Sequence, residues 1–191
     1  PKEAWLETSV DDYYRFNIHV VDDKGKVIAS GRDLAPLRDK YRERVQQNID
    51  AAIALVGKPD RLRPHIKTHK TKQVAQLLMN AGVQQFKCAT IAEAELLGMC
   101  KSKDVLLAYQ PVGPKLHRFL SLIQHYPDTL YACLVDNIAA AEEITKAAKT
   151  EGIVIHIFID LNVGMNRTGI APEEAMDLID FCLQQPSLQL S

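Results

Sequence analysis

The pattern of apolar and polar positions changes character along the chain. Over residues 14–20, apolar residues alternate with polar ones, and this period of two predicts a half-buried strand. Residues 22–25 (Asp-Asp-Lys-Gly) have the composition of a turn, and the apolar residues 27–29 follow them. The first region therefore predicts a β-hairpin.

A longer period begins at Pro36. Over residues 37–56, apolar residues recur at spacings of three and four, which predicts one face of an amphipathic helix. Pro36 suits the first turn of this helix, and residues 57–59 (Gly-Lys-Pro) end it. We expect two domains: a β-hairpin extension of different origin over residues 1–38, and an α/β domain over residues 39–191.

The second domain repeats one unit, in which a short apolar run is followed by a polar loop and a helical stripe. Such alternation predicts βαβ units and a parallel sheet, and hence an α/β fold. The predicted strands are 62–67, 85–89, 105–109, 130–135 and 153–161, with a further strand opening at Leu188. The predicted helices are 71–81, 91–99, 114–125, 137–149 and 172–184.

This repeat suits either an open doubly wound sheet or a (β/α) barrel. No glycine-rich phosphate-binding motif follows any predicted strand, so nucleotide-binding versions of the open sheet lose their usual support. A complete barrel needs eight units and about 250 residues. The chain has 191 residues, so it forms either a smaller open sheet or part of a barrel.

Composition narrows the class of protein. Hydrophobic residues make up 47% of the chain, enough for a folded core. The 23 basic and 24 acidic residues leave a net charge of −1, which argues against nucleic acid or an anionic membrane as the main partner. No apolar stretch approaches the length of a membrane span, and we expect a cytoplasmic protein. We interpret four cysteines as reduced core residues: Cys88, Cys100, Cys133 and Cys182.

The most informative segment for chemistry covers residues 61–72 (RLRPHIKTHKTK). If 62–67 is a strand, Arg63, His65 and Lys67 share one face, and Lys67 stands at the carboxyl end. Active sites of barrels and open α/β sheets lie at that end. Neighbouring cations and partial burial would disfavour the ammonium form of Lys67, and a neutral amine can form a Schiff base with a carbonyl compound.

Two other interpretations of this segment remain open. Basic runs at strand ends are often solvated faces or phosphate-binding patches. His65 and His69 have the spacing of metal ligands on a helix, but the apolar run predicts a strand and no cysteine or carboxylate lies nearby in the sequence.

A second informative segment covers residues 160–170 (DLNVGMNRTGI). A strand ends there in a loop with two glycines, which permit positive φ and close backbone approach to a ligand. Arg167 between them can offer a fork of donors to an oxygen anion, although most arginines at such positions are only surface residues.

Together the two segments carry a family resemblance. Residues 63–70 (RPHIKTHK) and 163–169 (VGMNRTG) resemble the D-threonine aldolase and D-serine dehydratase family. Residues 87–95 (KCATIAEAE) and 108–114 (AYQPVGP) also fall in the expected order. These are fold-type III pyridoxal 5'-phosphate enzymes, so the resemblance implies that residues 41–191 form part of an alanine racemase-like TIM barrel.

The resemblance assigns roles to a few residues. Lys67 matches the catalytic lysine that holds pyridoxal phosphate as a Schiff base. Arg167 matches an arginine near the phenolic oxygen of the cofactor, and His65 and Gln110 are further cofactor-binding candidates. The implied activity is that of a lyase that cleaves or dehydrates D-β-hydroxy amino acids, with the cofactor as electron sink.

The resemblance also implies a divalent metal that polarises the β-hydroxyl of the substrate. The ligands of that metal in the family lie in a C-terminal β domain outside these 191 residues, so we assign no metal ligand here. A non-catalytic PLP-binding barrel fragment is therefore an alternative. An open sheet would expose strand edges, and we expect a homo-oligomer.

Residues 1–38 have a different resemblance. Residues 16–22 (FNIHVVD) and 31–34 (GRDL) resemble part of the C-terminal region of bacterial DEAH-box RNA helicases, without any motor motif. With the basic run at 61–72, this leaves an RNA-associated module as a third hypothesis.

Overall fold

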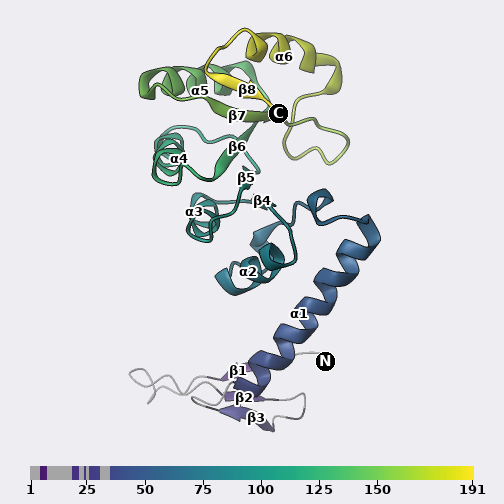
Figure 1. Ribbon diagram of the computed structural model, residues 1–191. Helices are drawn as coiled ribbons and strands as arrows, with labels where there is room; N and C mark the ends of the chain where they lie inside the picture. Colours follow the sequence, from purple (N-terminus) through teal and green to yellow (C-terminus); the bar gives the residue numbers. More distant parts are fainter. Residues whose placement is uncertain (1–4, 8–18, 22–23, 25, 31–34) are drawn as a thin grey trace. The chain divides into compact units, whose positions relative to one another are not determined.

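A computed structural model describes residues 5–7, 19–21, 24, 26–30 and 35–191 of the chain (Figure 1). The chain divides into two compact units, with the boundary between Ala52 and Ile53. That boundary falls inside a helix, and the two domains expected from the sequence remain a prediction. None of the described helices has the length and apolar character that a membrane span needs.

The first unit contains a small antiparallel sheet. Its strands are β1 (Trp5–Glu7), β2 (His19–Val21) and β3 (Val27–Ser30), in the order β1-β2-β3. The antiparallel pairing of β2 with β3 confirms the hairpin, while residues 14–18 of the predicted strand lie outside the described residues. The helix predicted over 37–56 is α1 (Ala35–Val56), which runs from this unit into the second.

The second unit is built on a parallel sheet, as the sequence predicted, and this sheet has five strands. The strands lie in sequence order, and each neighbouring pair is parallel. A parallel sheet in sequence order, with a helix in each connection, is the arrangement of part of a (β/α) barrel. The strands are β4 (Gln85–Cys88), β5 (Asp104–Leu107), β6 (Leu130–Val135), β7 (Ile155–Ile159) and β8 (Leu188–Leu190).

Five helices alternate with these strands, and successive helices contact each other (Figure 1). Their beginnings follow local chemistry: Thr90 Oγ1 accepts the Glu93 amide at 3.1 Å, and Asn137 Oδ1 accepts the Ala140 amide at 2.8 Å. The predicted helix 172–184 begins instead with a 3₁₀ turn, η4 (Pro172–Glu174). The helices are α2 (Lys72–Asn80), α3 (Ile91–Met99), α4 (Pro114–His125), α5 (Ile138–Glu151) and α6 (Ala175–Leu183).

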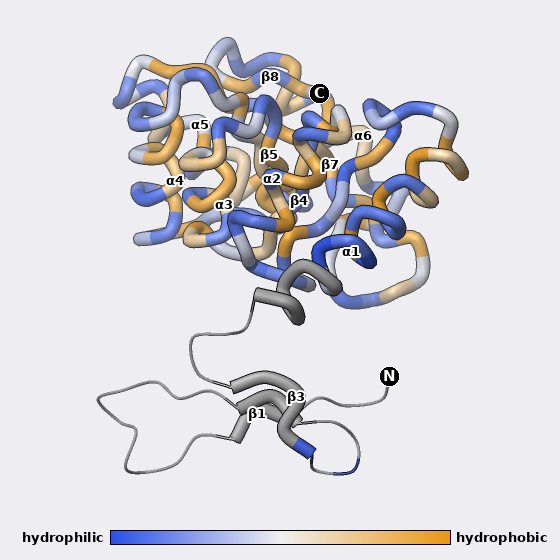
Figure 2. The backbone as a smooth tube through the Cα atoms, turned by 60° about the horizontal axis from the view of Figure 1, so that its bottom comes forward, coloured by the Kyte–Doolittle hydropathy of each residue, from blue (hydrophilic) through white to orange (hydrophobic). Residues whose placement is uncertain are grey.

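The core lies between the sheet and these helices. In β4, Phe86 and Cys88 are fully buried, while Gln85 and Lys87, on the opposite face, are half-buried. Figure 2 shows β5 and β7 as hydrophobic stretches among helices of mixed character. The four cysteines are free and buried, which confirms their interpretation as reduced core residues.

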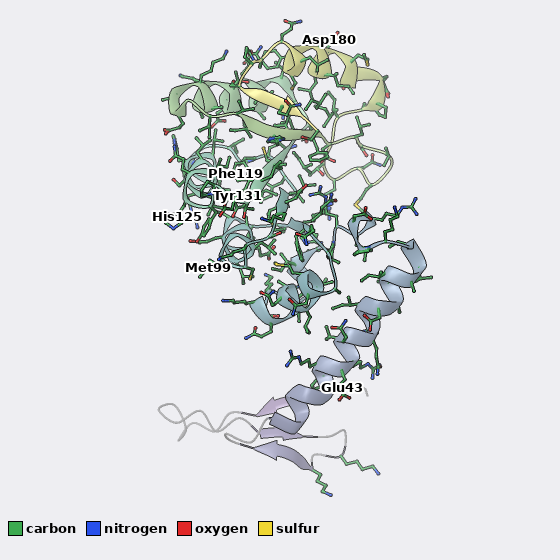
Figure 3. The ribbon with its side chains drawn as sticks, viewed as in Figure 1. Glu43, Met99, Phe119, His125, Tyr131 and Asp180 are labelled. Carbon is green, nitrogen blue, oxygen red and sulfur yellow. The ribbon has the colours of Figure 1, made fainter. Side chains whose placement is uncertain are left out.

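An aromatic contact locks α4 to β6. The rings of Phe119 and Tyr131 meet edge to face with centroids 6.2 Å apart, and both residues are buried (Figure 3). Tyr131 Oη also donates to the Ala94 carbonyl of α3 at 3.2 Å. Gly98 of α3 faces this tyrosine, and a Cβ atom built there would lie 2.2 Å from Tyr131 Oη. The glycine is therefore required for α3 to approach β6.

One predicted element is wrong. Residues 62–67 do not form a strand, because only His65 pairs with the sheet, through an isolated parallel bridge to Lys87. Pro64 has no amide hydrogen to donate to a ladder, although its carbonyl accepts the Lys87 amide at 2.9 Å. After His65 the chain turns into a 3₁₀ helix, η3 (Ile66–Thr68), so the strict alternation of faces stops before Lys67.

Candidate active site

Lys67 lies in η3, at the carboxyl end of β4. The turn is anchored by Ile66, whose side chain is fully buried, and by the Ile66 carbonyl, which accepts the amides of His69 at 3.1 Å and Lys70 at 2.8 Å. His65 Nδ1 accepts the Lys67 amide at 3.2 Å, and Thr68 Oγ1 donates to the His65 carbonyl at 3.2 Å. The backbone of Lys67 is therefore held on both sides.

The side chain of Lys67 is exposed, which corrects the expectation of a partly buried amine crowded by cations. Two of the neighbouring cations, Arg63 and Lys70, form ion pairs with carboxylates. Arg63 forms a bidentate ion pair with Asp104, with Nη2 3.0 Å from Oδ2, and its guanidinium lies 5.7 Å from the centroid of the Phe158 ring. Lys70 pairs with Glu93, so neither side chain adds an uncompensated charge beside Lys67.

Glu93 is the buried acid of this region, with only 6% of its side chain exposed. Its Oε2 accepts the Ala89 amide at 2.8 Å, and its Oε1 lies 3.4 Å from Lys70 Nζ. Thr90 Oγ1 in turn accepts the Glu93 amide in the first turn of α3, so Thr90 caps this helix. The same carboxylate also ties the end of the Lys67 segment to the beginning of α3.

Two histidines flank the lysine, and the pKa of each is lowered. Burial is the main cause for His65, and the charges of Lys67 and Lys87 lower its pKa further, against an opposing effect of Glu93. Burial also lowers the pKa of His69, opposed by its hydrogen bond to Thr71 and by Glu93. Both rings are therefore neutral at neutral pH, and His65 Nδ1 is free to accept the Lys67 amide.

Arg167 is exposed in the loop that follows β7. The loop is closed at its base by a parallel bridge between Leu161 and Ile170, and Asn162 Oδ1 accepts the amides of Gly164 at 3.2 Å and Asn166 at 3.1 Å. Within the described part of the chain, Arg167 forms no ion pair. Its guanidinium can therefore bind an anionic oxygen.

Gln110 follows β5 at the same end of the sheet. Its Nε2 atom is buried and, among the described residues, has no hydrogen-bond acceptor. A buried amide without an acceptor is costly, so this donor is suited to an acceptor atom that a ligand supplies.

The candidates from the sequence thus lie at the carboxyl end of the sheet. Gln110 follows β5, Arg167 follows β7, and Lys67 follows the bridge of His65 to β4. The structure brings His65 next to Lys67, while no hydrogen bond or ion pair joins Lys67 to Gln110 or Arg167 in the described residues. No set of three His, Cys, Asp or Glu side chains in the described residues could hold a metal.

Sequence reasoning missed Glu93 as a site residue and missed Lys87. A usable signal for Glu93 is its place three residues after Thr90, because a Thr-x-x-Glu pattern is typical of the beginning of a helix. Lys87 had no such signal, because its place beside His65 depends on a long-range bridge.

Two curated enzymes are similar to this chain in sequence. D-threo-3-hydroxyaspartate dehydratase of Delftia sp. (strain HT23) is 29% identical over 131 residues, which cover 69% of this chain and 32% of that protein. D-threonine aldolase of Arthrobacter sp. is 25% identical over 142 residues, covering 74% of this chain and 35% of that one. The chain therefore spans about a third of the length of the curated relatives it matches.

A crystal structure of D-threonine aldolase from Filomicrobium marinum has a similar fold. The TM-score is 0.66 at 26% identity, covering 80% of this chain and 40% of that one. These matches confirm the resemblance that the two sequence segments carried, whereas the comparisons give no support to the resemblance of residues 1–38 to RNA helicases. The model of the alanine racemase N-terminal domain matches residues 41–191, and the chain therefore belongs to the alanine racemase N-terminal domain family.

Proposed function

We propose that this chain is the cofactor-lysine part of a pyridoxal phosphate-dependent lyase that acts on D-β-hydroxy amino acids. The observation that carries the proposal is the exposed amine of Lys67 on a backbone turn fixed at the carboxyl end of a parallel sheet. The relatives support the substrate class, because one is a D-threonine aldolase and another is a D-threo-3-hydroxyaspartate dehydratase.

The residues present fit a bound pyridoxal phosphate. Lys67 offers an accessible primary amine. Within the part of the chain that the structure describes, Gln110 offers a buried donor without an acceptor, and Arg167 offers a guanidinium without an ion pair. When bound, the cofactor supplies an electron sink for the carbanion formed at Cα of an amino acid. Lys67 would hold its carbonyl carbon, and Arg167 and Gln110 would bind its polar groups.

His65 has a distinct part in this arrangement. Its Nδ1 accepts the Lys67 amide, so the neutral ring carries its proton on Nε2. The ring therefore orients the turn that presents Lys67 without adding a positive charge beside the amine. A protonated His65 would lose that acceptor and release the turn.

Labelling at Lys67 tests the cofactor part of the proposal. Pyridoxal phosphate is added to the purified chain, borohydride reduces the adduct, and peptide mass mapping locates the label. We expect the label on Lys67, lost in Lys67→Ala and retained in Lys101→Ala, an exposed lysine before β5. A label distributed over several lysines in proportion to their exposure would overturn the proposal.

The lyase part is tested with the full-length protein. We expect turnover of D-threonine or D-threo-3-hydroxyaspartate, with an aldehyde or a 2-oxo acid as product, and a dependence on a divalent metal. Because the described residues hold no metal site, we assign that metal to no residue of this chain. Labelling of Lys67 without turnover would favour a second candidate, a non-catalytic cofactor-binding module, which the short span of this chain against its relatives also permits.

We also propose that the protein is a cytoplasmic homo-oligomer. β8 lies at one edge of the five-stranded sheet, and its outer side pairs with no described strand. Unpaired strand edges favour association. Light scattering on the purified chain should give a mass of at least twice 21.4 kDa, and a monodisperse monomer would contradict this.

A further inference from the structure

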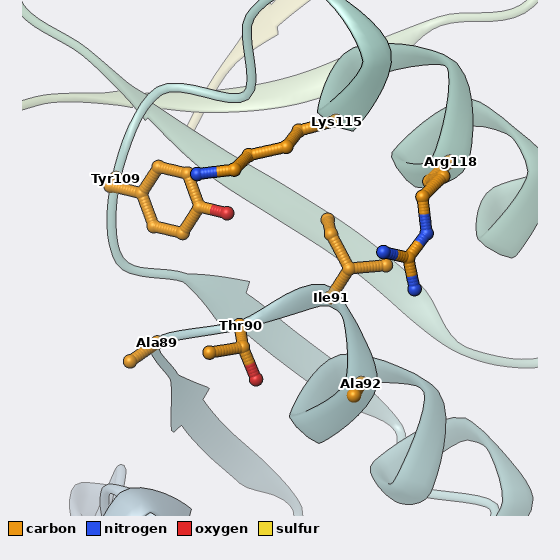
Figure 4. Close-up of a pocket in the computed structure, with 7 residues that line it drawn as sticks. All are labelled: Ala89, Thr90, Ile91, Ala92, Tyr109, Lys115 and Arg118. Atoms are coloured by element: carbon orange, nitrogen blue, oxygen red, sulfur yellow. The ribbon is translucent and has the colours of Figure 1, made fainter.

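A hollow that the Lys67 site does not use lies between the first turns of α3 and α4 (Figure 4). It has a volume of about 330 Å³ and opens at the carboxyl ends of β4 and β5. Its lining combines cationic, hydroxyl and small apolar side chains: Ala89, Thr90, Ile91, Ala92, Tyr109, Lys115 and Arg118.

The charge in this hollow is positive and uncompensated. Lys115 and Arg118 are one turn apart on α4, and neither forms an ion pair with a carboxylate among the described residues. Figure 4 shows Lys115 extended toward the Tyr109 ring and Arg118 extended along Ile91 toward the first turn of α3. Lys115 Nζ lies 5.2 Å from the centroid of the Tyr109 ring, so a cation–π contact holds the ammonium at the rim.

Further donors converge on the same space. The amides of Ile91 and Ala92 belong to the first turn of α3 and have no acceptor among the described groups. Thr90 Oγ1 accepts the Glu93 amide, which leaves its own hydrogen available to donate. Tyr109 contributes a phenolic hydroxyl, and burial raises the pKa of this group, which keeps it protonated.

We propose that this hollow binds the phosphate group of a small phosphate monoester. Two cationic side chains, two free amides and two hydroxyl groups match a dianion with three acceptor oxygens better than a monovalent carboxylate. The side chains of Ala89, Ile91 and Ala92 give the hollow an apolar floor that an organic group on the ester can contact. The site shares no residue with the Lys67 turn, so it stands whether or not Lys67 binds a cofactor.

Titration of the chain with inorganic phosphate and with phenyl phosphate, followed by calorimetry or amide chemical shifts, tests the proposal. We expect both to bind, phenyl phosphate more tightly, with shifts at Ile91 and Ala92. The double variant Lys115→Gln/Arg118→Gln should weaken both by about tenfold or more, because it removes both cations. Tyr109→Leu should weaken the aryl ester more than inorganic phosphate, because it removes the ring beside Lys115.

The matched control is Lys146→Gln/Lys149→Gln, which removes two cations at the same spacing from the exposed face of α5. We expect it to leave both affinities unchanged. Equal weakening by the two double variants would mean general attraction to positive charge, and it would overturn the site. No binding of either probe to the unmodified chain would also overturn it.

The phosphate of pyridoxal phosphate is a second possible source of this group, and labelling separates the two. Lys115→Gln/Arg118→Gln should leave borohydride labelling of Lys67 by pyridoxal phosphate intact. Loss of that labelling would mean that the hollow serves the cofactor, which would overturn a separate site.

Discussion

The buried carboxylate of Glu93 lies 3.4 Å from the ammonium nitrogen of Lys70, and this contact joins two segments that are distant in sequence. Lys70 itself has a positive φ of 49°, which a residue with a side chain adopts at some cost. The ion pair and the hydrogen bonds of η3 offset that cost. Through them, the turn that carries Lys67 is fixed to the beginning of α3.

Glu93→Gln should destabilise the chain by about 1–2 kcal/mol, because the amide keeps an acceptor for the Ala89 amide but loses the charge that pairs with Lys70. Urea denaturation measures this change. The matched control is Glu95→Gln, two residues further along α3 and exposed, which should change the free energy of unfolding by less than about 0.5 kcal/mol.

The same variant has a second readout. Glu93 raises the pKa of both His65 and His69, so Glu93→Gln should lower both values further, as NMR titration of the ring protons would show. Unchanged histidine titrations in a destabilised variant would mean that Glu93 only caps α3 and does not organise the lysine turn.

Stability should fall when the pH drops below about 6.5, the ordinary pKa of histidine. The pKa values of His65 and His69 are lowered in the folded chain, so just below pH 6.5 the unfolded chain binds more protons than the folded one. The stabilisation from keeping these rings neutral is therefore fully present above 6.5 and is lost as the pH falls through the folded values. Urea denaturation over this range measures the slope.

Two double variants test the source of that slope. His65→Gln/His69→Gln should flatten it, whereas His117→Gln with His125→Gln, two exposed residues of α4, should leave the contribution of His65 and His69 in place. If the free energy of unfolding still falls with pH after His65 and His69 are replaced, other groups cause the dependence.

Much of the fold follows from local pattern. The helix 114–125 and the strand 130–135 have the bounds that the sequence predicted, because the change from a period of about four to a run of apolar residues is sharp there. The prediction of a strand over residues 62–67 was wrong, because this segment forms an isolated bridge followed by a 3₁₀ turn. Pro64 prevents a ladder, and periodicity alone does not reveal which partner buries Ile66.

The sequence predicted only part of the candidate site. The end of a predicted strand and a family motif indicated Lys67, although a 3₁₀ helix lies there in the structure. The two glycines marked the Arg167 loop. The sequence did not predict that Lys67 is free of crowding by other cations, because this depends on the ion pairs that Arg63 and Lys70 form. Their partners, Asp104 and Glu93, lie more than twenty residues away in sequence.

Gly98→Ala should destabilise the chain by about 1–3 kcal/mol, because its Cβ atom would lie 2.2 Å from Tyr131 Oη and 2.8 Å from Tyr126 Cγ. Tyr131→Phe alone should cost about 1 kcal/mol by removing the hydrogen bond to the Ala94 carbonyl. In the Gly98→Ala background the same change should cost less or should stabilise, because it removes the clashing oxygen. Strictly additive free energies of unfolding in the double-variant cycle would mean that α3 shifts away from Tyr131 instead.

Gly169→Ala and Gly164→Ala form a matched pair in the loop that holds Arg167. Both glycines have positive φ, 99° and 116°, so both substitutions should cost about 1–2 kcal/mol of backbone strain. A Cβ at Gly169 would also lie 2.6 Å from the Asn162 amide nitrogen, whereas nothing lies within 4 Å of a Cβ at Gly164. Gly169→Ala should therefore be the more destabilising variant in urea denaturation.

The difference should also be local. The Asn162 amide donates to the Ile170 carbonyl at 2.9 Å, at the base of the loop. A clash at Gly169 should push the two ends of the loop apart there. Amide hydrogen exchange of Asn162 and Ile170 should accelerate in Gly169→Ala and stay near the original rate in Gly164→Ala. Equal exchange rates and equal stability in the two variants would mean that backbone strain alone governs this loop. Arg167 would then be held by the turn and not by the closed base.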